Sequence, residues 1–97
     1  MDRVRARVLI IGLVQGVYFR ANTRDCAKKH GVSGWVRNNS NGTVEAMLEG
    51  NGEDVKRVIE WCRIGPASAR IDRCDVQWQE YTGEFNDFVV LAGHASY

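Results

Sequence analysis

The sequence predicts one α+β domain in which two helices cover one face of an antiparallel sheet. Three observations lead to this prediction: apolar runs with the periodicity of strands, two segments with apolar residues at helical spacing, and an Asn-Gly turn between two of the strands. In chain order the elements are β-α-β-β-α-β, followed by a short edge strand. A chain of 97 residues is long enough to bury one hydrophobic core.

The first strand is predicted over residues 4–14. Its first half alternates between arginines and apolar residues, whereas its second half, "VLIIGLV", is apolar throughout. That change of pattern predicts a central strand whose far end is buried on both faces.

A helix is predicted over residues 21–30, where Thr23, Cys26, Ala27 and His30 recur at helical spacing. Gly31 stands where a left-handed cap ends such a helix. The segments 34–38 and 42–50 then predict two strands joined through Asn39-Ser40-Asn41-Gly42. Asn-Gly between extended segments is the strongest short-range hairpin signal, because both residues tolerate positive φ.

The second helix begins after Asn51, a residue type that caps helices, and ends at Gly65-Pro66. Its apolar stripe consists of Val55, Val58, Ile59 and Cys62. A long strand is predicted over residues 69–81, with a bulge near Asp72-Arg73, because its apolar residues cannot share one face in strict alternation. The edge strand covers residues 88–91. This order of elements describes a ferredoxin-like β-α-β-β-α-β sandwich, a fold that serves many unrelated functions.

Composition excludes several classes of protein. The formal net charge is +1, so no strong field favours nucleic acid or an anionic membrane as a partner. The longest apolar run, residues 8–14, is too short to span a bilayer, and nothing resembles a signal peptide, so we expect a cytoplasmic protein. RNA-binding domains share the predicted fold, but the segment "TVEAMLEG" contains no aromatic residue on which a base could stack.

The three cysteines, Cys26, Cys62 and Cys74, lack the spacing of a zinc site and do not suggest disulfides in a cytoplasmic chain. We interpret them as buried apolar side chains. A thiol nucleophile is the alternative, and only His30 or His94 could serve as its base. No metal site and no cofactor is predicted.

The segment "GLVQGVYFR", residues 12–20, joins the first strand to the first helix. A turn that leads into a helix exposes backbone N–H groups, and a glycine with positive φ allows them to converge on an anion. Arg20 would add a planar bidentate donor that stays charged. Taken alone, these residues fit a phosphate cradle or, equally, a tight turn followed by a surface arginine.

"GLVQGVYFR" followed by "GWVRNNSNGTVE" closely resembles the paired motifs of the acylphosphatase family. The resemblance covers nearly the whole chain and includes Thr23, Gly65-Pro66 and Phe88. It implies a ferredoxin-like domain over residues 1–97 that hydrolyses carboxylic–phosphoric mixed anhydrides without a cofactor. One position departs from the family: Asn41 stands where the hairpin mostly has Asp, and we expect the turn and the activity to persist.

The resemblance also implies the roles of individual residues. Arg20 binds the phosphoryl group and Asn38 orients the attacking water. Backbone amides of the loop complete the phosphate site; its residues are Gln15, Gly16, Val17, Tyr18, Phe19 and Arg20. Thr43 could hold Asn38 by a hydrogen bond across the hairpin, or could be an ordinary strand residue.

Other residues near these motifs have more than one interpretation. Tyr18 and Phe19 are expected to pack beneath the loop. Arg24 and Arg37 either attract anionic substrates or are solvated charges. One alternative is a binding or regulatory domain that keeps the phosphate site but does not catalyse hydrolysis. Another is a domain that is part of a larger enzyme handling carbamoyl phosphate. We expect a self-standing monomer.

Overall fold

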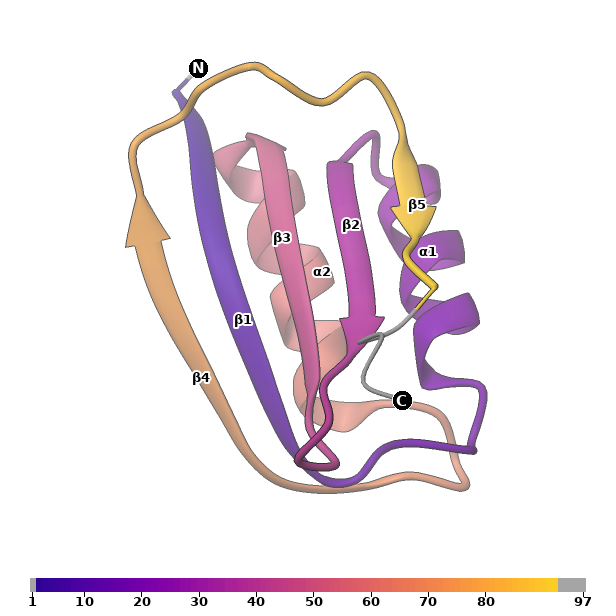
Figure 1. Cartoon of the computed structure of the whole chain (residues 1–97). Helices are drawn as coiled ribbons and strands as arrows, with labels where there is room; N and C mark the ends of the chain where they lie inside the picture. Colours follow the sequence, from indigo (N-terminus) through magenta and orange to yellow (C-terminus); the bar gives the residue numbers. More distant parts are fainter. Residues whose placement is uncertain (1, 93–97) are drawn as a thin grey trace.

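Two helices pack against one face of a five-stranded sheet (Figure 1). The structure is a computed structural model that describes residues 2–92; Met1 and residues 93–97, among them the candidate base His94, lie outside the described residues. The elements are β1 Arg3–Leu13, α1 Phe19–Lys29, β2 Ser33–Asn38, β3 Val44–Asn51, α2 Gly52–Ile64, β4 Arg70–Gln79 and β5 Phe88–Val90. The predicted order of elements is confirmed.

The sheet has the strand order β4-β1-β3-β2-β5. The first four strands pair antiparallel, as predicted, but β5 pairs parallel with β2. The sheet is therefore mixed, and the prediction of a wholly antiparallel sheet is wrong at this edge. The cause is the connection of residues 80–87, which crosses the end of the sheet from β4 and enters β5 beside the start of β2 (Figure 1).

The strand β1 is central, because it lies between β4 and β3. Val8 and Ile10 on its helix-facing side are fully buried. On the other side Leu9 and Ile11 are only partly buried and Leu13 is 53% exposed, so the predicted burial on both faces is wrong. Both helices pack on one face, and no helix or strand of residues 2–92 covers the opposite face (Figure 1).

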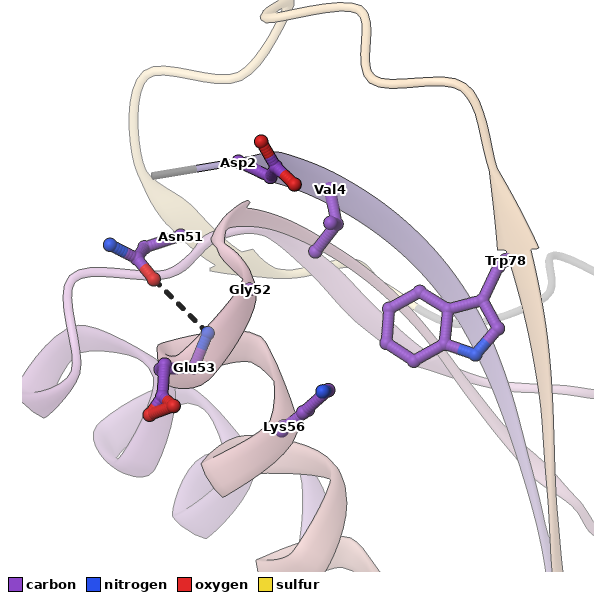
Figure 2. Close-up of a pocket in the computed structure, with 7 residues that line it drawn as sticks. All are labelled: Asp2, Val4, Asn51, Gly52, Glu53, Lys56 and Trp78. Carbon is purple, nitrogen blue, oxygen red and sulfur yellow. Dashed lines mark hydrogen bonds between the residues drawn. The ribbon is translucent and has the colours of Figure 1, made fainter.

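The predicted bulge lies where the sequence placed it. Ile11 pairs with Arg73 and Gly12 pairs with Ile71, so Asp72 is the extra residue of β4. The apolar residues of β4 on either side of Asp72 can therefore face the helices despite their broken alternation. The Asn51 cap is also confirmed, because its side chain accepts a hydrogen bond from the Glu53 amide at 3.0 Å (Figure 2).

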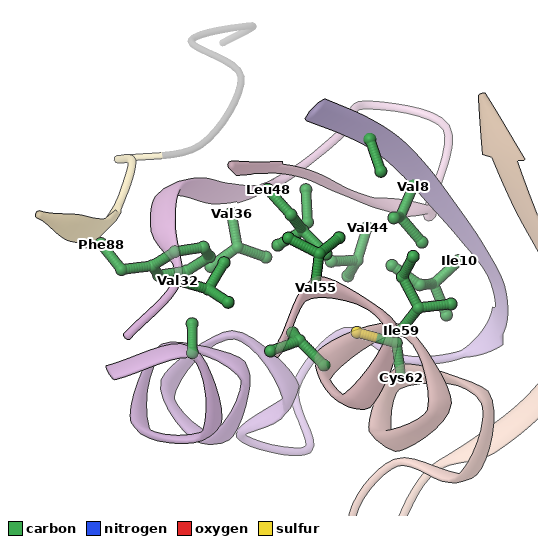
Figure 3. Packing of buried hydrophobic residues seen from close by; sticks show 14 of the residues in the cluster. Val8, Ile10, Val32, Val36, Val44, Leu48, Val55, Ile59, Cys62 and Phe88 are labelled. Carbon is green, nitrogen blue, oxygen red and sulfur yellow. The ribbon is translucent and has the colours of Figure 1, made fainter. Parts of the chain in front are cut away.

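The hydrophobic core fills the space between the sheet and the two helices (Figure 3). Cys62 is fully buried within this core, and burial raises the pKa of its thiol far above the ordinary value. Cys26 and Cys74 are half-buried, and burial raises the pKa of both. Because a nucleophile must be a thiolate, these raised pKa values disfavour the alternative of a catalytic cysteine.

A buried carboxylate anchors the connection of residues 80–87 to the sheet. Glu49 is 1% exposed, and its oxygens accept hydrogen bonds from the Arg5 guanidinium at 2.9 Å and from the Thr82 amide and hydroxyl, each at 2.9 Å. The Gly83 amide donates a further bond at 3.1 Å. Burial alone would raise the pKa of Glu49, but the bonds from Thr82 and Arg5 outweigh it and hold the pKa below the ordinary value.

Replacing Glu49 by glutamine is expected to lower the free energy of unfolding at pH 7 by about 2 kcal/mol, because charge-assisted hydrogen bonds are lost. The wild-type advantage should shrink as the pH falls below 4.5, the ordinary pKa of the carboxyl group, since the folded state holds Glu49 charged. Urea denaturation of both proteins across this range measures the difference. A difference that stays constant on acidification would contradict this account of Glu49.

Candidate active site

The loop between β1 and α1 has an unusual backbone. Gly16 has a φ of 76°, as predicted, and Tyr18 has a φ of 61°. Tyr18 is the only residue other than glycine with positive φ among residues 2–92. A left-handed residue directly before a helix is the type of conformation in which successive backbone N–H groups form a concave anion site.

The loop is held in place from below. Phe19 is 1% exposed, and its ring packs against Trp61 with the ring centroids 5.3 Å apart. Gly65 makes this possible, because a Cβ there would come within 3.0 Å of the Phe19 ring. The prediction of packing beneath the loop is thus confirmed for Phe19. It is wrong for Tyr18, which is 81% exposed because its left-handed backbone turns the side chain outward.

Several donors of the loop are unused by the protein. Within residues 2–92, the amides of residues 16–20 donate to no backbone or side-chain acceptor. The first hydrogen bond of the helix runs from the Asn22 amide to the Tyr18 carbonyl, at 3.1 Å. The first amides of a helix always lack partners within the helix. Here they lie beside a pocket, so an anion could accept their hydrogen bonds.

Arg20, on the first turn of α1, lines a pocket of about 400 Å³. The lining residues are Val14, Gly16, Tyr18, Phe19, Arg20, Ala21, Arg24 and Val90. Among the described residues, Arg20 forms no ion pair, whereas Arg5, Arg7 and Arg37 are each paired with a buried glutamate. The pocket therefore contains a guanidinium that no acidic side chain neutralises.

Arg24 and Arg37, each of which had two interpretations, lie on different parts of the structure. Arg37 lies on the uncovered face of the sheet, where it pairs with Glu45 at 2.9 Å and lies over the Trp35 ring at 5.0 Å. Burial alone would raise the pKa of Glu45, but hydrogen bonds from Arg37 and Arg7 hold that pKa below its ordinary value. Arg37 is therefore a structural charge, whereas Arg24 lines the same pocket as Arg20.

Asn38 is the last residue of β2 and lies at the end of the sheet where β1 ends and α1 begins (Figure 1). Side chains alternate along a strand, so Asn38 faces the helices, as the buried Val36 does. Its Oδ1 atom is buried and accepts no hydrogen bond from the described residues. Buried acceptors are rarely left unpaired, so this unpaired oxygen at the end of β2 is a candidate for a functional role. Asn38 does not itself line the pocket of Arg20.

Thr43 does not hold Asn38, and that prediction is corrected. The Thr43 hydroxyl donates to Asn41 Oδ1 at 2.7 Å and accepts from Asn39 Nδ2 at 3.0 Å. The reason is the register, in which Asn38 pairs with Val44 and the Asn39 amide donates to the Thr43 carbonyl at 2.9 Å. Thr43 thus braces the turn, and Asn41 contributes only an oxygen, which an aspartate would supply equally well.

Gln15 joins the loop to the hairpin. Its side-chain Nε2 donates to the carbonyls of Asn39 and Thr43, both at 2.9 Å. Gln15 was predicted as part of the phosphate loop, but this role of its side chain was missed. The sequence contains no sign of it, because the acceptors are backbone carbonyls of residues that lie 24 and 28 positions away. The clamp fixes the hairpin that carries Asn38 relative to the loop that leads to Arg20.

A second hollow in the structure differs from the pocket of Arg20 in its charges. A hollow of about 530 Å³ lies at the opposite end of the sheet, where Asp2, Val4 and Trp78 face the start of α2 (Figure 2). Its charged side chains, Asp2, Glu53 and Lys56, include both signs. Among residues 2–92, no three side chains of His, Cys, Asp or Glu converge as a metal site would need. No helix in this range is long and apolar enough to cross a membrane.

The chain is similar to known proteins along most of its length. The family model described as Acylphosphatase matches residues 6–90. A protein of Pyrobaculum aerophilum named Acylphosphatase is 54% identical over 92 residues, which cover 94% of this chain and 97% of the relative. The solved structure of an acylphosphatase from Coxiella burnetii superposes with a TM-score of 0.88 and 30% identity, covering 93% of this chain and 94% of that one. Full-length HypF, solved in a phosphate- and nucleotide-bound form, matches with a TM-score of 0.87 and 30% identity, and 95% of this chain aligns with only 12% of HypF.

Proposed function

This chain belongs to the acylphosphatase family, and we infer that it is an enzyme that hydrolyses acyl phosphates to a carboxylate and inorganic phosphate. We further propose which residues carry the reaction. In this proposal the loop of residues 15–20 and Arg20 hold the phosphoryl group, and Asn38 positions the water. The observation that carries it is the pocket of Arg20: among residues 2–92 the Arg20 guanidinium forms no ion pair, and the loop amides beside it donate to no acceptor.

Phosphate binding follows from the chemistry of these donors. Arg20 offers parallel N–H groups to two phosphate oxygens. The amides of residues 16–20 offer fixed dipoles at the positive end of α1. Because the donors are set by the backbone and by the buried Phe19, they need not reorganise as charge spreads over the phosphoryl oxygens in the transition state.

Asn38 acts on the attacking water. Its amide oxygen accepts a hydrogen bond from the water, and its NH₂ group donates to phosphate or to a neighbour. Amide oxygen and nitrogen can exchange places by rotation about the last side-chain bond, so either can face the substrate. Asparagine is a poor base, and in this proposal the proton of the water passes to a phosphate oxygen of the substrate.

The bonds that form and break in the proposed reaction can be stated in full. The water oxygen forms a bond to phosphorus, the bond from phosphorus to the acyl oxygen breaks, and the electron pair leaves with the carboxylate. A carboxylate is a good leaving group, so no strong general acid is required. We propose that no metal ion takes part, that the protein acts as a monomer in the cytoplasm, and that residues 1–97 are one domain.

Hydrolysis of benzoyl phosphate in the presence of excess chelator tests the proposed function. We expect release of inorganic phosphate far above the uncatalysed rate, competitive inhibition by inorganic phosphate, and no loss of rate with chelator or with a thiol-blocking reagent. Loss of rate with chelator alone would contradict the metal-free reaction. Phosphate binding that depends on Arg20, without any turnover, would mean that the loop is an anion receptor.

A further inference from the structure

We propose that Arg24 is a specificity-determining residue that binds a second anionic group on the acyl portion of the substrate. The proposal rests on the proposed function, because it assigns the acyl side of the same pocket. It predicts that the enzyme prefers acyl phosphates that carry an additional carboxylate or phosphate over those that do not.

The helix places Arg24 beside Arg20 and farther from the loop. The two residues are four apart on α1, so they share one face of the helix and are separated by one turn, about 6 Å along the axis. Both line the pocket of about 400 Å³. Since the loop amides and Arg20 lie at the start of the helix, a group bound at Arg24 must belong to the part of the substrate beyond the phosphate.

The Arg24 guanidinium forms only one weak, exposed ion pair among the described residues. Its only ion pair among the described residues is with Asp25, the next residue, at 3.3 Å, and the side chains of Arg24 and Asp25 are 41% and 66% exposed. That contact uses the Nε atom, so the two terminal nitrogens of the guanidinium keep their N–H groups. Exposed pairs of this kind contribute little to stability, and a substrate anion could replace or supplement the contact at small cost.

The pocket as a whole is cationic. Among the described residues, its lining contains Arg20 and Arg24 and no acidic side chain. One guanidinium and the loop amides suffice for a phosphoryl group, so the second guanidinium has no anion to bind in a simple acyl phosphate. An additional anion on the acyl group would give it one.

The other residues that line the pocket suit the carbon skeleton that would join the two anionic groups of the substrate. Val14, Tyr18 and Val90 are apolar or aromatic, and the exposed Tyr18 ring lies at the rim of the pocket. These side chains can contact a short carbon skeleton but offer no charged group of their own. The structure therefore assigns the phosphate to Arg20, the skeleton to the apolar walls and the second anion to Arg24.

Matched substrates test this assignment. The 3- and 4-carboxybenzoyl phosphates differ from the 3- and 4-methylbenzoyl phosphates by one negative charge at nearly constant size, and the two positions sample two distances from the phosphate. For the wild type we expect a higher kcat/KM for at least one carboxylated compound than for its methyl analogue. In R24Q this preference should fall by roughly three- to tenfold, through KM, because one partly exposed charge-assisted contact is lost.

A control variant separates recognition from general attraction. Arg57 on α2 forms no ion pair among residues 2–92 and does not line this pocket, so R57Q removes the same charge elsewhere and should leave the preference unchanged. Lysine at position 24 should retain part of the preference. Equal losses on carboxylated and methyl substrates in R24Q, or no preference in the wild type at either position, would overturn the proposal. Failure to hydrolyse any of the four compounds would instead refute the proposed function.

Discussion

Lysine in place of Arg20 is expected to lower kcat/KM for benzoyl phosphate by about 10²-fold. A lysine keeps the charge but offers a point charge on a flexible stem, whereas a guanidinium binds two phosphate oxygens in one plane. We expect kcat to fall and the inhibition constant of inorganic phosphate to rise. In the proposed site the Arg20 guanidinium contacts the phosphoryl group both in the ground state and in the transition state. Steady-state kinetics with phosphate as a competitor measure both quantities.

The matched control for Arg20→Lys is Arg57→Lys. Arg57 also lacks an ion pair among the described residues, and it lies on α2 away from the pocket of Arg20. We expect kinetic constants within a factor of about two of the wild type for this variant. Near-normal kinetics of Arg20→Lys would contradict the phosphate cradle, because only the geometry of the donors differs between the two side chains.

Alanine in place of Asn38 is expected to lower kcat by about 10²-fold while the inhibition constant of inorganic phosphate changes little. If Asn38 positions the water, as we propose, the substitution removes that group and leaves the loop and Arg20 intact. The free energy of unfolding should fall only slightly, because the Asn38 oxygen accepts no hydrogen bond within the described part of the chain. Kinetics, phosphate inhibition and urea denaturation of one preparation test the three statements together.

Asn39→Ala is the control for Asn38→Ala, because it removes the same amide from the next residue. Asn39 faces Thr43, to whose hydroxyl it donates at 3.0 Å, and its loss should weaken the turn while leaving kcat within about threefold of the wild type. Similar losses of kcat in both variants, or equal losses of kcat and phosphate affinity in Asn38→Ala, would mean that Asn38 supports the loop and does not position water.

Local patterns predicted most of the elements, because they depend on neighbours in the chain. The Asn51 cap and the break in alternation at Asp72 each have a local cause, and each is found in the structure. The hairpin at Asn41-Gly42 is also found, although of these two residues only Gly42 has positive φ. The direction of β5 could not be predicted in this way. It depends on the route of residues 80–87, which Glu49 fixes by accepting hydrogen bonds from Thr82 and Gly83, more than thirty residues away.

In the candidate site, too, some features follow from local sequence and others depend on the tertiary structure. The sequence by itself determined that a glycine turn and Arg20 stand at the start of a helix, and that Asn38 ends a strand, because period and turn chemistry are local. Only the tertiary structure decided which side chains meet: Gln15 clamps the hairpin, Thr43 braces Asn39 instead of Asn38, and Arg24 shares the pocket of Arg20. Those contacts depend on register and packing between distant segments, which local patterns in a single sequence do not predict.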